Sequence, residues 1–74
     1  MKNYLLSVGF VVYKTGCPCN GTPRYFKNSN HPDYIIVLRG NNFSIRKGGA
    51  EKTKGNTLEQ LTTKIMEYEL NTTN

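Results

Sequence analysis

The chain has little of what many enzymes and secreted domains depend on. Its 74 residues include one histidine, two cysteines and five acidic residues. We find no Ser-His-Asp set, no paired carboxylates and no Gly-rich phosphate loop, so the sequence offers no familiar catalytic constellation. No stretch approaches the ~18 apolar residues of a membrane span, and we expect no membrane partner. The apolar run at residues 5–12 leads into Lys14 rather than a cleavage site, which argues against a signal peptide.

The two cysteines, Cys17 and Cys19, are separated by a single proline. A disulfide across one residue would be strained, so we do not expect this pair to stabilise the fold as a disulfide. The pair therefore favours a reducing, cytoplasmic location. With His31 they supply three candidate zinc ligands, and a closed structural site needs four. Asp33, or a second chain sharing its ligands, could complete such a site. We expect instead a metal-free structural loop over residues 15–23, shaped by turn-forming residues, and no cofactor.

The length predicts one domain over residues 1–74, with residues 71–74 frayed. The net charge is +5 and is unevenly distributed. Residues 1–54 carry nine Lys or Arg against Asp33 and Glu51, a balance of +7, while residues 55–74 carry Lys64 against three glutamates, a balance of −2. A basic body with an acidic C-terminal end suits an anionic partner such as nucleic acid; solubility alone is the alternative.

Residues 34–47 form the clearest structural signal, two β-rich runs separated by Gly40-Asn41-Asn42. Gly at the first central position suits a type II′ turn, so we predict a hairpin centred on Gly40 and Asn41. Directly opposed residues share a face, which places four apolar side chains together: Ile36, Leu38, Phe43 and Ile45. The opposite face is half apolar and half basic, with Ile35, Val37, Arg39, Ser44 and Arg46.

The segments around the hairpin are less sharply defined. Residues 2–8 have helical spacing and Gly9 suits the left-handed C-cap, so we predict a short helix; one strand over residues 4–14 is the alternative. Strands are predicted at residues 10–14 and 24–27, and loops at residues 15–23 and 28–33. Residues 48–55 are expected to form a flexible basic connection. Gly48-Gly49 within it suggests anion binding, but the predicted helix starts seven residues later.

A second helix is predicted after Asn56, which can cap it in a capping box with Glu59. Its apolar stripe contains Leu58, Leu61, Ile65 and Tyr68, with Met66 and Leu70 off the stripe. The order α-β-β-β-β-α predicts a single two-layer α+β domain. Its mainly antiparallel four-stranded sheet would be covered on one face by both helices. The predicted core is Leu5, Ile36, Leu38, Phe43, Ile45, Leu58, Leu61 and Ile65.

Basic and aromatic residues alternate along the predicted strands. Cations near a phosphate backbone, with aromatic faces for stacking, are the components of RNA or single-strand binding. The aromatic candidates are Tyr13, Tyr25, Phe26 and Tyr34; the alternative is that they fill the core beneath a solvated basic rim. The candidate nucleic-acid-binding residues are Arg24, Lys27, Arg39, Arg46, Lys47, Lys52 and Lys54. His31, in a polar loop before Pro32, is a candidate general acid or base.

Three short motifs carry a family resemblance: L-L-S-V-G-F at the start, F-K-N…H-P-D before a strand, and K-G-N-T-L-E at the last helix. They resemble the small HicA-type toxins, RNA-cleaving partners of toxin–antitoxin pairs. The positions that match the family are Gly9-Phe10 and Lys54-Gly55. Thr57-Leu58 also match, but the extra residue Asn56 shifts them along the chain. The resemblance implies an α-β-β-β-α fold like that of double-stranded-RNA-binding domains. The family's catalytic histidine has no counterpart, because Pro23-Arg24-Tyr25 stand in its place.

Three functions therefore follow from the sequence. We expect a non-enzymatic cytoplasmic binding module that contacts RNA or DNA through a basic surface. A HicA-like ribonuclease is the enzymatic alternative. A protein–protein adaptor or homodimer, using Ile35 and Val37 on the open face of the sheet, is the third.

Overall fold

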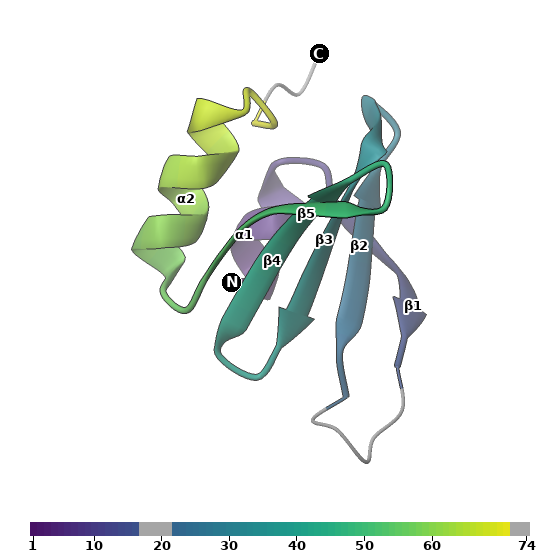
Figure 1. The fold of residues 1–74 in the computed structure, drawn as a ribbon, viewed down its shortest axis with the longest axis vertical. Coiled ribbons are helices and arrows are strands. Elements are labelled where there is room, and N and C mark those ends of the chain that lie inside the picture. Colours follow the sequence, from purple (N-terminus) through teal and green to yellow (C-terminus); the bar gives the residue numbers. More distant parts are fainter. Residues whose placement is uncertain (17–21, 72–74) are drawn as a thin grey trace.

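The computed structural model describes residues 1–16 and 22–71, which form two helices and an antiparallel five-stranded sheet (Figure 1). The α+β class is confirmed, but the sheet has one strand more than predicted. The elements in chain order are α1 (Lys2–Ser7), β1 (Val11–Thr15), β2 (Arg24–Asn28), β3 (His31–Arg39), β4 (Asn42–Lys47), β5 (Ala50–Gly55) and α2 (Leu58–Glu67). Each strand pairs with the next in the chain, in the order β1-β2-β3-β4-β5.

The central hairpin has the predicted register. Arg39 pairs with Asn42, Leu38 with Phe43 and Ile36 with Ile45. Gly40 has a φ of +58° and Asn41 does not have a positive φ, which fits a type II′ turn. The turn chemistry and the alternation of apolar residues agree, so this part of the fold is determined locally.

The fifth strand corrects the prediction of a flexible connection over residues 48–55. Gly48 and Gly49 have φ values of +59° and +87°, as a type I′ hairpin turn requires, and Lys47 pairs with Ala50 across it. β5 is composed largely of charged and small residues, which have low strand propensity by themselves. Its pairing with β4 overrides that preference. Gly48-Gly49 is thus a strand connection and does not lead directly into a helix.

The predicted loop at residues 28–33 is also mostly strand. A tight turn at Ser29 and Asn30 joins β2 to β3, and Asn28 pairs with His31. The next pair is Lys27 with Ile35, so Pro32 lies in a short stretch that has no partner in β2. Proline is tolerated there because no ladder hydrogen bond to β2 is required of it.

The helix termini agree with the prediction in one case and differ in the other. α1 ends before Gly9, whose φ of +99° confirms the left-handed cap. α2 begins one residue later than predicted: Thr57 is its N-cap, and its hydroxyl accepts a hydrogen bond from the Gln60 N–H at 3.1 Å. Gln60 in turn accepts from the Asn56 N–H at 2.9 Å. The capping side chains are therefore Thr57 and Gln60 instead of Asn56 and Glu59, and Gln60 accepts from the residue before the N-cap.

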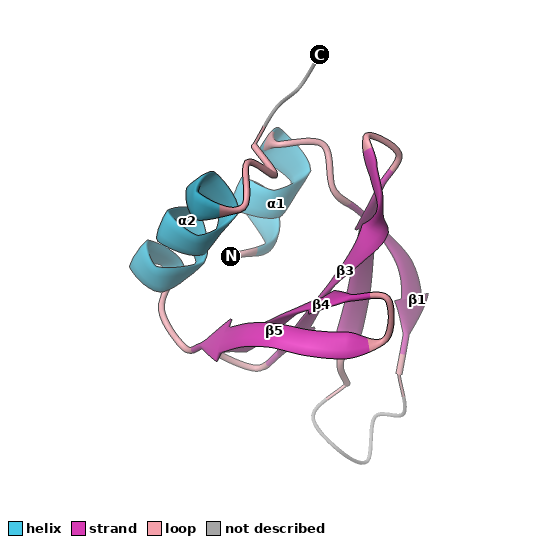
Figure 2. Ribbon diagram, turned by 45° about the horizontal axis from the view of Figure 1, so that its top comes forward, coloured by secondary structure: helices cyan, strands magenta, loops and turns pink. Residues whose placement is uncertain are grey.

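The core lies between the helices and one face of the sheet, and Figure 2 shows α1 and α2 on the same side of the strands. Seven of the eight predicted core residues are buried; Leu58 is wrong, with 47% of its surface exposed. Leu58 follows the N-cap directly and its side chain lies outside the buried stripe formed by Leu61 and Ile65. Four further buried hydrophobics were not predicted: Val8, Phe10, Phe26 and Leu70.

Candidate nucleic-acid interface

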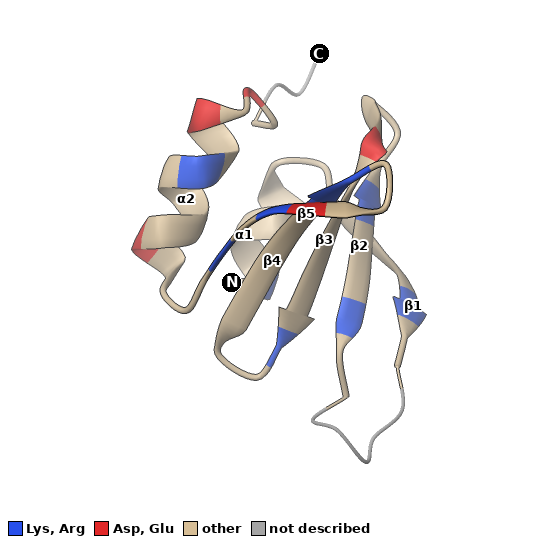
Figure 3. Ribbon diagram, viewed as in Figure 1, with Lys and Arg blue, Asp and Glu red and all other residues tan. Residues whose placement is uncertain are grey.

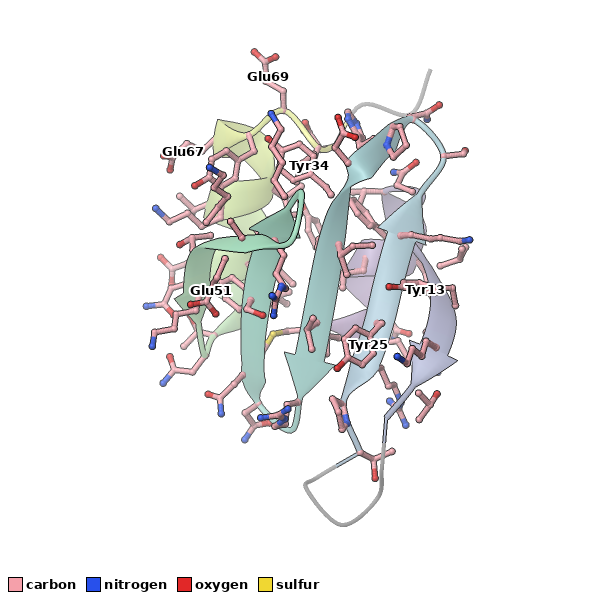
Figure 4. The ribbon with its side chains drawn as sticks, turned by 45° about the vertical axis from the view of Figure 1, so that its right-hand side comes forward. Tyr13, Tyr25, Tyr34, Glu51, Glu67 and Glu69 are labelled. Carbon is pink, nitrogen blue, oxygen red and sulfur yellow. The ribbon has the colours of Figure 1, made fainter. Side chains whose placement is uncertain are left out.

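The strands leave one face of the sheet without a helix, and we call it the open face. Alternation along the strands places Phe26, Ile36 and Ile45 in the core, so their neighbours in sequence point to the opposite side. Figure 4 looks onto this side, with Tyr13, Tyr25 and Glu51 in front of the ribbon. The open-face residues of β2 to β4 include Tyr25, Lys27, Ile35, Val37, Arg39, Asn42, Ser44 and Arg46.

A groove of about 700 Å³ crosses the open face, and we call it the open-face groove. Its sides come from four strands, β2 to β5, with Asn56 and Gln60 at the start of α2 closing one end, and Arg39 and Asn42 line it near the β3–β4 turn. Its lining also includes Tyr25, Val37, Ser44, Arg46, Glu51 and Lys54. The volume lies in the range of sites that hold a small organic ligand, so the groove can accept one or a few nucleotides of a longer strand.

The curvature of the groove comes from a bulge in β5. Ile45 pairs with Thr53 and Arg46 with Glu51, which leaves Lys52 without a partner in β4. A bulge bends its strand and increases the local twist. Figure 1 shows the result: β5 crosses in front of β4, on the side of the sheet opposite α1.

Three exposed cations, Arg39, Arg46 and Lys54, line the open-face groove from three adjacent strands. Arg46 Nη2 donates a hydrogen bond to the Gly49 carbonyl at 2.9 Å, which holds the guanidinium near the β4–β5 turn. Within residues 1–16 and 22–71, none of the three is held in an ion pair by a carboxylate. Their charge is therefore available to an anionic ligand. The acidic residues lie mostly in and after α2, as Figure 3 shows.

Two tyrosines and two lysines interlock on the open face beside the groove. Lys27 Nζ lies 5.2 Å from the centre of the Tyr13 ring, and Lys14 Nζ lies 5.4 Å from that of Tyr25. The two rings meet edge to face at 6.4 Å. Tyr13 belongs to the bulge in β1, between the Val12–Phe26 and Lys14–Tyr25 pairs. The cluster places aromatic faces and cations together, as stacking on a nucleic acid requires.

Not all of the predicted binding residues lie on the open face. Arg24 shares its face of β2 with buried Phe26 and lines a separate hollow with Met1 and Lys2. Lys47 stacks over Tyr34, with Nζ 5.4 Å from the ring centre, and Tyr34 in turn contacts Tyr68 after α2. Lys52 is the bulge residue of β5. The structure thus brings together Lys27, Arg39, Arg46 and Lys54 on one face and places the other three elsewhere.

Sequence reasoning missed two members of this surface, Lys14 and Glu51. Lys14 was assigned to a strand end, and the edge-strand bulge that brings it beside Tyr25 has no clear signal in the sequence. Glu51 was part of the supposed flexible connection. Recognising Gly48-Gly49 as a hairpin turn would have found β5 and, with it, the acidic residue opposite Arg46.

The remaining site candidates do not join the groove. His31 begins β3, with its ring 6.5 Å from that of Tyr34, and is not among the groove residues. Cys17 and Cys19 lie outside the described residues, so the metal-free loop stays a prediction. Among the residues that the structure does describe, no group of three or more His, Cys, Asp or Glu is placed to hold a metal ion. Neither helix in that part of the chain is long and apolar enough to cross a membrane.

Comparisons with known proteins add no assignment. No family model, curated protein or solved structure matches this chain. The resemblance to HicA-type toxins stays a prediction.

Proposed function

We propose that the sheet and its two helices act as a two-layer nucleic-acid-binding module, with the open face as the binding surface. The observation that carries this proposal is the gathering of Arg39, Arg46 and Lys54 in one concave groove that Tyr25 also lines. Phosphate contacts by Lys and Arg supply most of the affinity of non-specific nucleic-acid binding. Tyr25 and Tyr13 supply ring surfaces that suit bases of any sequence.

The two alternatives have weaker support on the same surface. A protein partner would need the apolar open-face residues, yet Ile35 and Val37 are half-buried and lie among cations. Interface centres are depleted of charged residues, so this face suits an anionic ligand better. A ribonuclease would need an acid or base at the bound strand, and His31 lies outside the groove.

The first test is binding of RNA and DNA oligonucleotides at several salt concentrations. Affinity should fall steeply as salt rises, because binding releases counterions from the phosphates. Replacing Arg39 and Arg46 together by Ala should weaken binding and reduce the slope of log K against log salt by about 1.4 for a single strand. The measurement is fluorescence anisotropy with labelled oligonucleotides.

The matched control is the double variant Arg24→Ala/Lys47→Ala, which removes the same charge from positions outside the groove. It should retain most of the binding and most of the salt slope. Equal losses in the two double variants would show that net charge alone drives association and would contradict the proposed site. If neither RNA nor DNA binds at low salt, the result would favour the protein-partner alternative. If the wild type cleaves the RNA and His31→Ala abolishes that cleavage, the ribonuclease alternative is established.

A further inference from the structure

An acidic side chain lies within the cationic groove. Glu51 is the one carboxylate among the groove-lining residues that the structure describes, and it is exposed. It stands directly across from Arg46 in the register of β4 and β5. Figure 4 shows Glu51 on the open-face side of β5. A carboxylate repels phosphate, so for a surface that only holds a backbone its presence lowers the affinity.

Glu51 is not held by Arg46, the cation across from it in the sheet. Arg46 directs Nη2 to the Gly49 carbonyl at 2.9 Å, and within the described part of the chain Glu51 makes no hydrogen bond or ion pair of its own. Its two oxygens are therefore free to accept hydrogen bonds from a ligand. An ionised carboxylate has no proton to donate, so it pairs only with donors.

We infer that Glu51 reads a base of a single strand lying in the open-face groove and selects cytosine over uracil. This inference rests on the proposed function. Cytosine carries an exocyclic amino group that donates to Glu or Asp, whereas the corresponding position of uracil is a carbonyl that only accepts. Cytosine and uracil are similar in size, so a carboxylate placed at the 4-substituent, away from the N3–H that uracil also donates, attracts the first base and repels the second.

The ligand we infer is a single-stranded RNA, whose bases are not held in a stack of pairs. The deep, narrow major groove of A-form RNA also keeps side chains from its bases, whereas unpaired bases can be splayed out onto a protein surface. The groove matches this geometry, since it is concave and lined by cations with an aromatic ring at one side.

The path of the strand follows from the order of β2, β3, β4 and β5 in the sheet. Tyr25 on β2 and Glu51 on β5 are three strand spacings apart, roughly 15 Å in a flat sheet. One base cannot reach both, so different nucleotides contact them. The nucleic acid therefore crosses the strands, with one base on Tyr25, another at Glu51, and phosphates near Arg39 and Arg46.

The test compares RNA oligomers of about eight cytidines and about eight uridines, a length within the usual span of single-strand sites. Wild-type protein should bind the cytidine oligomer about tenfold more tightly, the discrimination expected of one good base contact. Glu51→Ala should bring the ratio close to one, mainly by strengthening uridine binding. Glu59→Ala removes an equal charge from the exposed first turn of α2 and should leave the ratio near tenfold.

The outcomes separate this inference from the proposed function. Equal, salt-sensitive binding of both oligomers by the wild type would overturn the role of Glu51 and leave the nucleic-acid site standing. A cytidine preference that survives Glu51→Ala would also overturn it. Failure of the wild type to bind either oligomer, while its thermal melt is intact, would overturn the proposed function itself.

Discussion

At the scale of single residues, the two helices end alike although only one ends on glycine. After α1, the Gly9 N–H donates to the Leu6 carbonyl and the Phe10 N–H to that of Leu5. After α2, the Glu69 and Leu70 N–H groups make the equivalent bonds to Met66 and Ile65. Both are Schellman motifs, closed by a buried hydrophobic residue, Phe10 or Leu70.

Glu69 occupies the position that favours glycine, with a φ of +58°. A side chain with a Cβ is strained in this left-handed conformation by about 1–2 kcal/mol, and glycine is not. Glu69→Gly should therefore be more stable than Glu69→Ala by about 1 kcal/mol. Both variants lose the carboxylate, so the difference isolates the backbone effect, and urea unfolding measures it. A more stable alanine variant would show that the turn after α2 is not left-handed in solution.

At the scale of elements, α2 separates two leucines that the sequence pattern treats alike. Leu58 and Leu61 both belong to the predicted stripe, yet Leu61 is fully buried and Leu58 is 47% exposed. The difference arises because the N-cap is Thr57, which places Leu58 at the first position of the helix, where α2 meets the end of β5. Position along the helix, as well as angular position around it, decides burial.

Leu61→Ala should destabilise the protein by about 2–5 kcal/mol, since it leaves a cavity in the core. Leu58→Ala should change the stability by no more than about 0.5 kcal/mol, as expected of an exposed site. Chemical denaturation of the two variants gives the comparison directly. Similar losses in both would show that Leu58 is buried and that the original core assignment was right.

At the scale of the whole molecule, burial is greatest at the central strand of the sheet and decreases toward the β1 edge. β3 pairs along both edges and carries Ile36 and Leu38 into the core, whereas β1 is an edge strand whose residues are all exposed. Hydrophobic side chains on that edge, including Val11 at 51% exposure, contribute little to burial. Stability should therefore be unevenly distributed across the fold.

Native-state hydrogen exchange should show this gradient. The amides of Ile36 and Ile45 should be among the slowest to exchange and should report global unfolding. The amides of β1 should exchange through local opening at lower free energy, because only β2 holds that strand and a bulge interrupts their pairing. Protection of β1 equal to that of β3 would indicate that a partner covers its free edge, in this protein or in a second copy.

The parts of this protein in which local and tertiary preferences coincide could be predicted from the order of the amino acids. The hairpin from β3 to β4 has both a glycine turn and two strongly alternating apolar runs, and Gly9 marks the end of α1 without any tertiary context. The candidate binding residues Arg39 and Arg46 followed from the same alternation, because a period of two fixes the face of every residue once the turn is known.

The bulges, and hence the groove, depend on tertiary structure, and the Gly48-Gly49 turn is the single local signal for β5. Ala50–Gly55 has weak intrinsic strand preference and becomes a strand because β4 offers it a free edge of backbone donors and acceptors. A bulge depends on how two strands match in length and twist, which no short window of sequence encodes. Arg46, Lys54, Glu51 and Tyr25 share a surface for that reason, and the function proposed here depends on that arrangement.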